Sequence, residues 1–378
     1  MRALAVVSNF KWQHIDYLMA LGQHLDLAVA TSGEGHEGSI DYATGVGLRS
    51  TALGRIEEIG GVEMSRRIAH LLREWKPEVV HLMYYHHEEL VPIVRSIIDD
   101  KTLVVFECRD PITTIRRVGS GSQIAFLEGE ALRASDAQIF VSRALRTYYE
   151  DLHDLKLEAT SIVVPHSFAR YNAGPPSEKL STRDNRIHIA LVGTADPMPG
   201  GGRWYGDIIR RLVALGFVVH SHFHEIEGES LEQYQALAQE LSDYHCHPTV
   251  GFRHGTELSK VISRYDLMGV FYELEAIRDN ESATLRVCMP TKAVCGWFNG
   301  AIPVVCFPHY EGLRDWIKEF GIGFIAGGWD DLARLLHNRP AIDEATNRCL
   351  SLRDRFSNEY NADRIVQFVG SQLARLRA

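Results

Sequence analysis

The chain has 378 residues, a net charge of −9, and 45% apolar and 24% charged residues. Its length exceeds what one hydrophobic core usually supports, which predicts two domains of roughly 150–200 residues each. The acidic balance argues against a nucleic-acid partner, because neutralising phosphates requires a surplus of Lys and Arg. It also provides no general attraction to an anionic membrane, although a local basic patch could.

Short apolar runs, rich in β-branched residues, alternate with segments of helical period. This pattern is typical of buried parallel strands joined by crossover helices. In the first half, strands are predicted at 4–8, 27–31, 79–83, 103–107, 137–141 and 161–164. Helices are predicted between them, at 14–25, 62–74, 90–98, 126–134 and 142–152. The polar stretch 33–61 is irregular and is expected to hold one weak strand at most.

The composition changes at residues 170–185, which are polar, contain Gly174, Pro175 and Pro176, and lack periodicity. Such a segment is typical of a linker. Beyond it, strands are predicted at 187–192, 218–222, 249–252, 267–271, 302–306 and 323–326. Helices are predicted at 204–215, 232–241, 256–264, 291–299 and 312–319, with a last helix at 359–376.

The same alternation on both sides of the linker predicts an α/β protein with two Rossmann-like, doubly wound parallel-sheet domains that face each other across a cleft. The expected boundaries are 1–170 for the first domain, 171–186 for the linker, 187–355 for the second domain and 356–378 for a C-terminal helix. Doubly wound sheets bind small molecules beyond the carboxyl ends of their strands, so functional residues are expected just after strands.

Six cysteines are scattered without a CxxC pair, which in a chain of this length indicates reduced, mostly buried side chains. No apolar run approaches about 18 residues, so no transmembrane helix is expected. The start, MRALAVVSNF, has too short an apolar stretch for a secretion signal and is interpreted as the first strand. These features together predict a cytoplasmic protein.

Several segments, in order along the chain, resemble GT-B glycosyltransferases, especially the large nucleotide-sugar-dependent family that includes many bacterial surface-polysaccharide enzymes. In the first half these segments are KPEVVHL at 76–82, ASDAQIFVS at 134–142 and VVPHSF at 163–168. In the second half they are IALVG at 189–193, HPTVGFRHGTEL at 247–258, YD at 265–266, PTK at 290–292 and GAIPVV at 300–305. The glycine-rich first loop of the family is absent, since residues 8–14 contain no glycine.

The resemblance implies transfer of a sugar from a nucleotide diphosphate sugar, such as a UDP-sugar, to an unidentified acceptor hydroxyl in glycoconjugate biosynthesis. It implies a donor bound by the second domain, a small-molecule, glycan or lipid-linked acceptor bound by the first, and a final helix that packs back on the first domain. Peripheral membrane contact remains open. GT-B enzymes need no metal for this reaction, so no cofactor and no metal are assigned.

A nucleotide-sugar carries two phosphate charges, which fixed cations and backbone amides can stabilise in the transition state. Lys292, with Thr291 beside it, begins a helix introduced by Pro290 and is expected to meet these phosphates; the alternative is a solvated lysine on a turn. Gly193 and Thr194 follow the first strand of the second domain. They are expected to allow close approach of the backbone to a ligand; the alternative is an ordinary tight turn.

By the resemblance, three further residues complete the donor site. Arg253 and His254 lie in a loop that would hold the nucleobase, and Glu275 takes the place of the family's first glutamate. The place of the second glutamate falls near Cys295 and Gly296, so a retaining mechanism is unsupported.

Transfer with inversion needs a base within reach of the acceptor hydroxyl. Asp110, just past a first-domain strand, is the first candidate, and a turn or N-cap role before Pro111 is its alternative. His14, at the start of the first helix, is the second candidate. Arg109, Tyr84 and His86 are expected to line the acceptor pocket.

Alternating histidines at 220, 222 and 224, with two more at 245 and 247, raise the possibility of a metal site, because alternate strand residues share a face. No carboxylate partner is specified, so a metal is not assigned. Two other functions stay open: an inert GT-B protein that binds a nucleotide-sugar or a partner without turnover, and an epimerase acting on a nucleotide-sugar. The donor sugar, the acceptor, the stereochemistry and the oligomeric state are not determined by the sequence.

Overall fold

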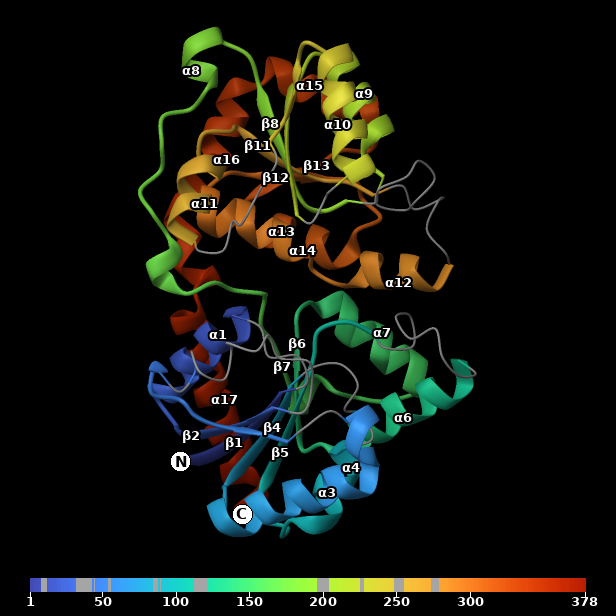
Figure 1. Cartoon of the computed structure of the whole chain (residues 1–378), viewed down its shortest axis with the longest axis vertical. Coiled ribbons are helices and arrows are strands. Elements are labelled where there is room, and N and C mark those ends of the chain that lie inside the picture. The colour runs from blue at the N-terminus through green and yellow to red at the C-terminus, as the bar shows by residue number, and fades with distance from the viewer. Residues whose placement is uncertain are drawn as a thin grey trace. The chain divides into compact units, whose positions relative to one another are not determined.

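The computed structural model contains two compact units, one formed by Met1–Pro165 with Asn358–Ala378 and the other by His166–Ser357 (Figure 1). The structure describes the chain except residues 8–11, 32–42, 44, 54–55, 84–87, 89, 112–120, 196–203, 225–227, 248–254 and 273–278. For residues 12–13, 56–61, 121–124, 224, 255–256 and 279–282 it describes the backbone alone. Among the described helices, none is long and apolar enough to cross a membrane.

The first unit is built on a seven-stranded sheet in the order β3-β2-β1-β4-β5-β6-β7, with every pairing parallel. Its strands are β1 (Arg2–Val7), β2 (Asp26–Thr31), β3 (Arg49–Ala52), β4 (Val79–Met83), β5 (Leu103–Cys108), β6 (Ala137–Phe140) and β7 (Ser161–Val163). The connecting helices include α1 (Trp12–Gly22), α3 (Ile56–Trp75), α4 (Leu90–Ile97), α6 (Gly121–Ala134) and α7 (Arg143–His153). The central strands are buried throughout, which explains their continuous apolar sequence.

The C-terminal helix belongs to this first unit. Helix α17 (Asn358–Arg377) lies beside α1 and the sheet in Figure 1. Its buried Ile365, Val369 and Leu373 join one apolar cluster with Leu18 of α1 and Val29 of β2. The helix therefore completes a core that the first 165 residues begin.

The second unit repeats the architecture with six parallel strands in the order β10-β9-β8-β11-β12-β13. Its strands are β8 (His188–Thr194), β9 (Val218–His224), β10 (Tyr244–Cys246), β11 (Leu267–Val270), β12 (Val304–Cys306) and β13 (Gly323–Ile325). Its helices include α8 (Ser181–Asp184), α9 (Gly206–Leu215), α10 (Gly228–Glu240), α11 (Gly255–Ile262), α12 (Asp279–Val287), α13 (Thr291–Val294), α14 (Glu311–Phe320), α15 (Trp329–Arg334) and α16 (Arg339–Leu352). The sheet separates two apolar clusters, one on each face.

In this second sheet the strand order reverses between β8 and β11, since β9 and β10 extend one way from β8 while β12 and β13 extend the other. Doubly wound sheets bind ligands beyond the carboxyl ends of the strands at such a switch point. The prediction of two doubly wound parallel-sheet domains is confirmed, and β8 and β11 define where a site in the second unit is expected.

An aspartate ties the start of one central strand to its neighbour in each sheet. Asp136, directly before β6, accepts a hydrogen bond from the Val104 amide at 2.8 Å and donates its own amide to the Val104 carbonyl at 2.9 Å. Asp266, directly before β11, makes the same pair with His188, at 2.8 and 2.9 Å. These aspartates belong to two of the segments that resemble GT-B enzymes, and their role here is to hold strand register.

The residues expected to form a linker are bonded to the second unit. The Ser177 amide donates to Ser263 Oγ at 2.9 Å, Lys179 Nζ donates to the Tyr265 carbonyl at 2.6 Å, and the Ser181 hydroxyl donates to Asp266 at 2.6 Å. The polar composition of this stretch therefore reflects bonds to the end of α11 and the start of β11. Burial lowers the pKa of Lys179 to about 8.

Helix 291–299 forms as predicted, but its second half is a π-helix. Helix α13 continues into η4 (Cys295–Gly300), and all six residues of η4 are buried. A Cβ on Gly296 would come within 2.9 Å of Met268 of β11, and one on Gly300 within 2.6 Å of Ile262 of α11. Only glycine permits this close approach, which holds the start of α13 against the sheet.

The structure contains several helices and strands that were not predicted from the sequence. Strand β3 lies in the stretch 33–61, for which one weak strand at most was expected, whereas strand β10 and helices α8, α12, α15 and α16 were not predicted. The strand expected at 249–252 lies outside the described residues, and the edge position of the sheet is taken by β10 at Tyr244–Cys246. An edge strand is short and only partly buried, so its apolar signal is weak.

We predict that Asp266→Ala lowers the free energy of unfolding by about 3 kcal/mol, because it removes the acceptor of the buried His188 amide and the carboxylate that lies 2.7 Å from the Arg339 guanidinium. Urea denaturation measures the loss. Asp243→Ala is the control, since Asp243 pairs with Arg186 at a partly exposed site and should cost less than about 1 kcal/mol. Equal losses would contradict the assigned role.

Candidate functional site

A lysine occupies the switch point of the second sheet. Lys292, second residue of α13, donates a hydrogen bond from Nζ to the Tyr205 hydroxyl at 2.6 Å. The same Nζ lies 4.2 Å from the ring centroid of Tyr272, which follows β11, and 5.2 Å from that of Tyr205. The hydroxyl and the aromatic face together orient the ammonium group.

Gly193, near the end of β8, lies directly beneath this lysine. Its φ is +118°, a conformation that side-chain-bearing residues rarely adopt. A Cβ built on Gly193 would lie 3.5 Å from Lys292 Cε and 3.7 Å from Nζ. Lys292, expected at the donor phosphates, and Gly193, expected at a ligand or in a tight turn, are therefore neighbours at the switch point.

Buried tyrosines fix both aromatic partners of Lys292. Tyr205 is 1% exposed and packs against Phe223, with ring centroids 4.9 Å apart, and its amide donates to the Tyr234 hydroxyl at 3.2 Å. The Tyr272 amide donates to the Tyr310 hydroxyl at 2.7 Å. Lys292 is thus held by groups whose own positions are fixed by packing, as a preorganised binding group requires.

The other donor-site candidates are placed only in part. Thr194 ends β8 and is exposed, and Thr291 begins α13 and is half-buried. Arg253, His254 and Glu275 lie outside the described residues, as do Tyr84 and His86 of the expected acceptor pocket. Tyr205 and Tyr272 were not among the predicted site residues, because the order of residues along the chain does not show that both contact Lys292.

In the first unit, Arg109 follows β5 and is anchored by a buried carboxylate. Its Nε donates to Glu107 Oε1 at 2.6 Å, and its guanidinium lies 5.3 Å over the Tyr17 ring. Glu107 also accepts from the Tyr17 hydroxyl at 3.2 Å and lies 2.9 Å from His81 Nε2. An acceptor anion at Arg109 would have to compete with Glu107 for this charge.

Burial would raise the pKa of Glu107, but the Arg109 charge and the His81 hydrogen bond outweigh it and lower the pKa to about 2. Glu107 is therefore ionised at neutral pH, and it is 3% exposed. Its role is to orient Arg109 and Tyr17. A residue so enclosed is not itself available to remove a proton from a substrate.

The two candidate bases also belong to the first unit. Asp110 is half-buried, and its carbonyl oxygen lies 3.3 Å from the Tyr149 hydroxyl, which lies 2.9 Å from Glu128 Oε1. His14 is 7% exposed and lies one helical turn before Tyr17, so both occupy the same face of α1. His14 therefore lies one turn of α1 from Tyr17, the residue whose ring lies under the Arg109 guanidinium.

The clustered histidines of the second unit form a chain of hydrogen bonds. His188 Nε2 lies 3.1 Å from Asp184, His188 Nδ1 lies 2.9 Å from His220 Nε2, and His220 Nδ1 lies 3.1 Å from His247 Nε2. His222 Nε2 contacts the Tyr265 hydroxyl at 2.8 Å. In the described part of the chain, no three His, Cys, Asp or Glu side chains are placed to hold a metal ion.

These contacts explain the alternation of histidine along β9. His220 and His222 point to the face opposite Phe223 and are buried there. Burial, followed by the neighbouring imidazoles of His245, His247 and His188, lowers the pKa of His220 to about 2. His220 is therefore neutral at physiological pH, and its ring stacks on those of His188 and His247.

No family model and no curated protein sequence matches this chain. Solved structures do match. HepE from Anabaena in complex with UDP superposes with a TM-score of 0.68 at 11% identity, covering 98% of this chain and 100% of HepE. Sucrose-phosphate synthase from Thermosynechococcus elongatus superposes with a TM-score of 0.67 at 12% identity, covering 99% and 100%. The lipopolysaccharide outer core galactosyltransferase WaaB superposes at 0.64 and 12%, covering 98% and 100%.

The chain therefore has the GT-B fold. A structure of a putative UDP-N-acetylglucosamine 2-epimerase from Listeria monocytogenes also matches, at a lower TM-score of 0.55 and 9% identity, covering 97% of this chain and 94% of that one. Identities this low establish the fold alone. The chemistry has to be argued from the residues at the carboxyl ends of the strands.

We predict that the second unit loses stability as the pH falls below about 6.5. An unfolded histidine binds a proton there, whereas folded His220 stays neutral down to a pKa of about 2, so its contribution is fully present above pH 6.5 and declines by about 1.4 kcal/mol per pH unit below it. Urea denaturation between pH 7 and pH 5 measures the slope.

His220→Gln should reduce this slope by about one proton, because the variant has no group to protonate at that position. His337→Gln, which changes an exposed histidine, should leave the slope unchanged. Identical slopes in the two variants would contradict the prediction.

Proposed function

We propose that the protein is a glycosyltransferase that moves a sugar from a nucleoside diphosphate sugar to an acceptor hydroxyl. The observation that carries the proposal is Lys292 above Gly193 at the switch point of the second sheet. In a GT-B protein the donor diphosphate belongs at such an edge, where a fixed cation and close backbone approach stabilise phosphate oxygens.

The reaction breaks the bond between the anomeric carbon and the diphosphate, and negative charge grows on the departing oxygen. A cation placed beforehand stabilises that charge without reorganising in the transition state. The Tyr205 hydroxyl and the Tyr272 ring restrict Lys292 Nζ to one place, so the cost of ordering the lysine side chain is met on folding.

UDP is the first nucleotide to test. The HepE structures to which this chain is similar contain UDP, UDP with glucose, and UDP-glucose. For this chain, the nucleobase and the donor sugar remain part of the proposal.

The acceptor would bind the first unit. We assign Asp110 as the base that takes the acceptor proton, since it follows β5 on the edge where ligands bind. Arg109, held by Glu107, would orient the acceptor, and His14 is the alternative base. Tyr84, His86, Arg253, His254 and Glu275 keep their proposed binding roles, and no metal is required.

We predict that Lys292→Ala weakens UDP binding at least tenfold, because the diphosphate loses a charge-assisted hydrogen bond. Isothermal titration measures the dissociation constant. Tyr205→Phe, which removes the hydroxyl that Lys292 contacts, should weaken binding by a smaller factor of about three.

Lys318→Ala removes an exposed lysine from α14 of the same unit and serves as the control for net charge. Its dissociation constant for UDP should match that of the wild type. If Lys292→Ala binds UDP as tightly as Lys318→Ala does, Lys292 is not at the diphosphate.

We predict that Asp110→Asn lowers the transfer rate by a factor of about 100 or more, since general-base catalysis contributes that much, while UDP affinity is unchanged. Initial rates with radiolabelled UDP-sugars and an acceptor panel measure the loss. A variant with wild-type turnover would exclude Asp110 as the base and leave His14 as the remaining candidate.

The epimerase alternative is kept because an epimerase shares the fold. It predicts that a UDP-sugar is converted to its epimer with no acceptor present. Product analysis by nuclear magnetic resonance separates the two reactions, since a transferase releases UDP and an epimerase keeps the nucleotide attached to the sugar.

A further inference from the structure

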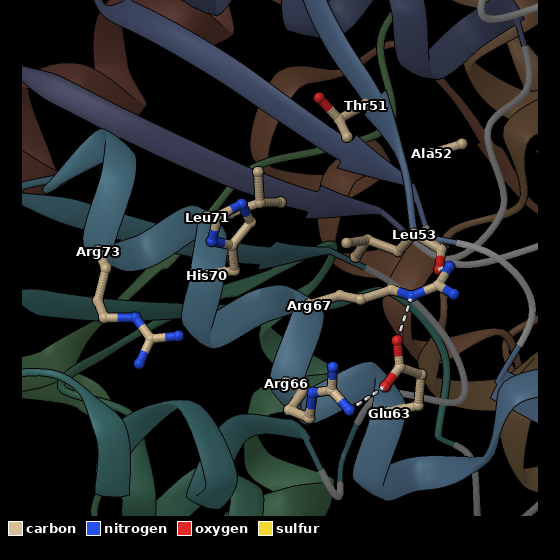
Figure 2. Close-up of a pocket in the computed structure, with 9 residues that line it drawn as sticks. All are labelled: Thr51, Ala52, Leu53, Glu63, Arg66, Arg67, His70, Leu71 and Arg73. Carbon is tan, nitrogen blue, oxygen red and sulfur yellow. Dashed lines mark hydrogen bonds and ion pairs between the residues drawn. The ribbon is translucent and has the colours of Figure 1, made fainter.

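A pocket of about 330 Å³ lies in the first unit, between β3 and α3 (Figure 2). One wall is formed by residues 51–53, at the end of β3, and the other by α3 from Glu63 to Arg73. Small-molecule sites span about 300–1,000 Å³, so the pocket has room for a small organic ligand. It belongs to the unit that does not contain Lys292.

The α3 wall is basic, although the whole chain carries a net charge of −9. Three arginines line it, Arg66, Arg67 and Arg73, with His70 between them. Glu63 is the one acidic residue in the lining. At neutral pH the three guanidinium charges exceed the single carboxylate, so the pocket favours an anion over a cation.

Arg67 is positioned before any ligand binds. Its Nε donates to Glu63 Oε1 at 2.9 Å and its Nη1 donates to the Leu53 carbonyl at 2.6 Å, so the guanidinium links α3 to the end of β3. Figure 2 shows Arg66 and Arg67 converging on Glu63, which lies 3.3 Å from Arg66 Nη1. Glu63 therefore offsets one of the two charges and orients both side chains.

Arg73 contributes a further charge, and no hydrogen bond or ion pair is found for it among the residues that the structure describes. Leu53 and Leu71 provide apolar lining, and Thr51 provides a hydroxyl. Guanidinium groups match the geometry of phosphate oxygens, while apolar lining suits a carbon skeleton.

We infer that the pocket between β3 and α3 binds a phosphate-bearing ligand through Arg66, Arg67 and Arg73. Two sources present this chemistry: a soluble phosphate ester and the headgroup of an anionic lipid. Val62, 84% exposed, lies one helical turn before Arg66 and would face the acyl region if the source were a lipid. The site is independent of the proposed function, because it needs neither the donor nor Lys292.

The test compares Arg66→Gln/Arg73→Gln with a charge-matched control, Arg334→Gln/Arg348→Gln, which changes two exposed arginines of the second unit that pair with nearby carboxylates, as Arg66 does with Glu63. All titrations use the Lys292→Ala background, which weakens phosphate binding at the proposed donor site. Circular dichroism checks that both variants fold. Glycerol 3-phosphate is the soluble probe, and phosphatidylcholine vesicles with and without phosphatidylglycerol are the lipid probe.

We expect at least one probe to bind the Lys292→Ala protein, and we expect Arg66→Gln/Arg73→Gln to weaken that binding tenfold or more while the control stays within a factor of two. Binding of glycerol 3-phosphate identifies a soluble ester, and binding only to vesicles that contain phosphatidylglycerol identifies a headgroup. Failure of both probes to bind at millimolar concentration, or equal weakening in the two variants, overturns the inference.

Discussion

The position of Lys292 depends on the packing of its side chain against Gly193, a glycine with a positive φ. Gly193 leaves the space and allows the backbone conformation, and the glycines of η4 bring the helix that carries Lys292 close to β11. Tyr205 and Tyr272 then fix the ammonium group from either side. Each of these contacts lies within the second unit, so the proposed phosphate site is formed by one folded body.

The two units share one architecture but differ in the charged groups near the carboxyl ends of their strands. Both sheets are parallel, and both lock a central strand with an aspartate, Asp136 or Asp266, bonded to the neighbouring backbone. In the first unit, charges after β5 are paired internally, as Arg109 is with Glu107. In the second, Lys292 contacts the Tyr205 hydroxyl and the Tyr272 ring. These two arrangements are the basis for the proposed roles of the units, with the acceptor in the first and the diphosphate in the second.

The sequence was sufficient to predict a strand where a continuous apolar run marked it. Central strands such as β4 and β8 are buried on both faces, so their apolar runs identified them, whereas β3 has the burial of an exposed edge and gave no comparable run. Lys292 and Gly193 were found from motif order. Tyr205, Tyr272, Glu107 and His81 were missed, because their importance comes from contacts between residues distant in the chain. The alternating histidines raised the possibility of a metal site, but in the structure His188, His220 and His247 form a hydrogen-bonded stack.

A crystal structure with bound UDP tests the central claim most directly. We expect a diphosphate oxygen within hydrogen-bonding distance of Lys292 Nζ and beside the Gly193 backbone, at the carboxyl ends of β8 and β11. A nucleotide bound at any other part of the chain, with no phosphate oxygen near Lys292 Nζ, would contradict the proposed site.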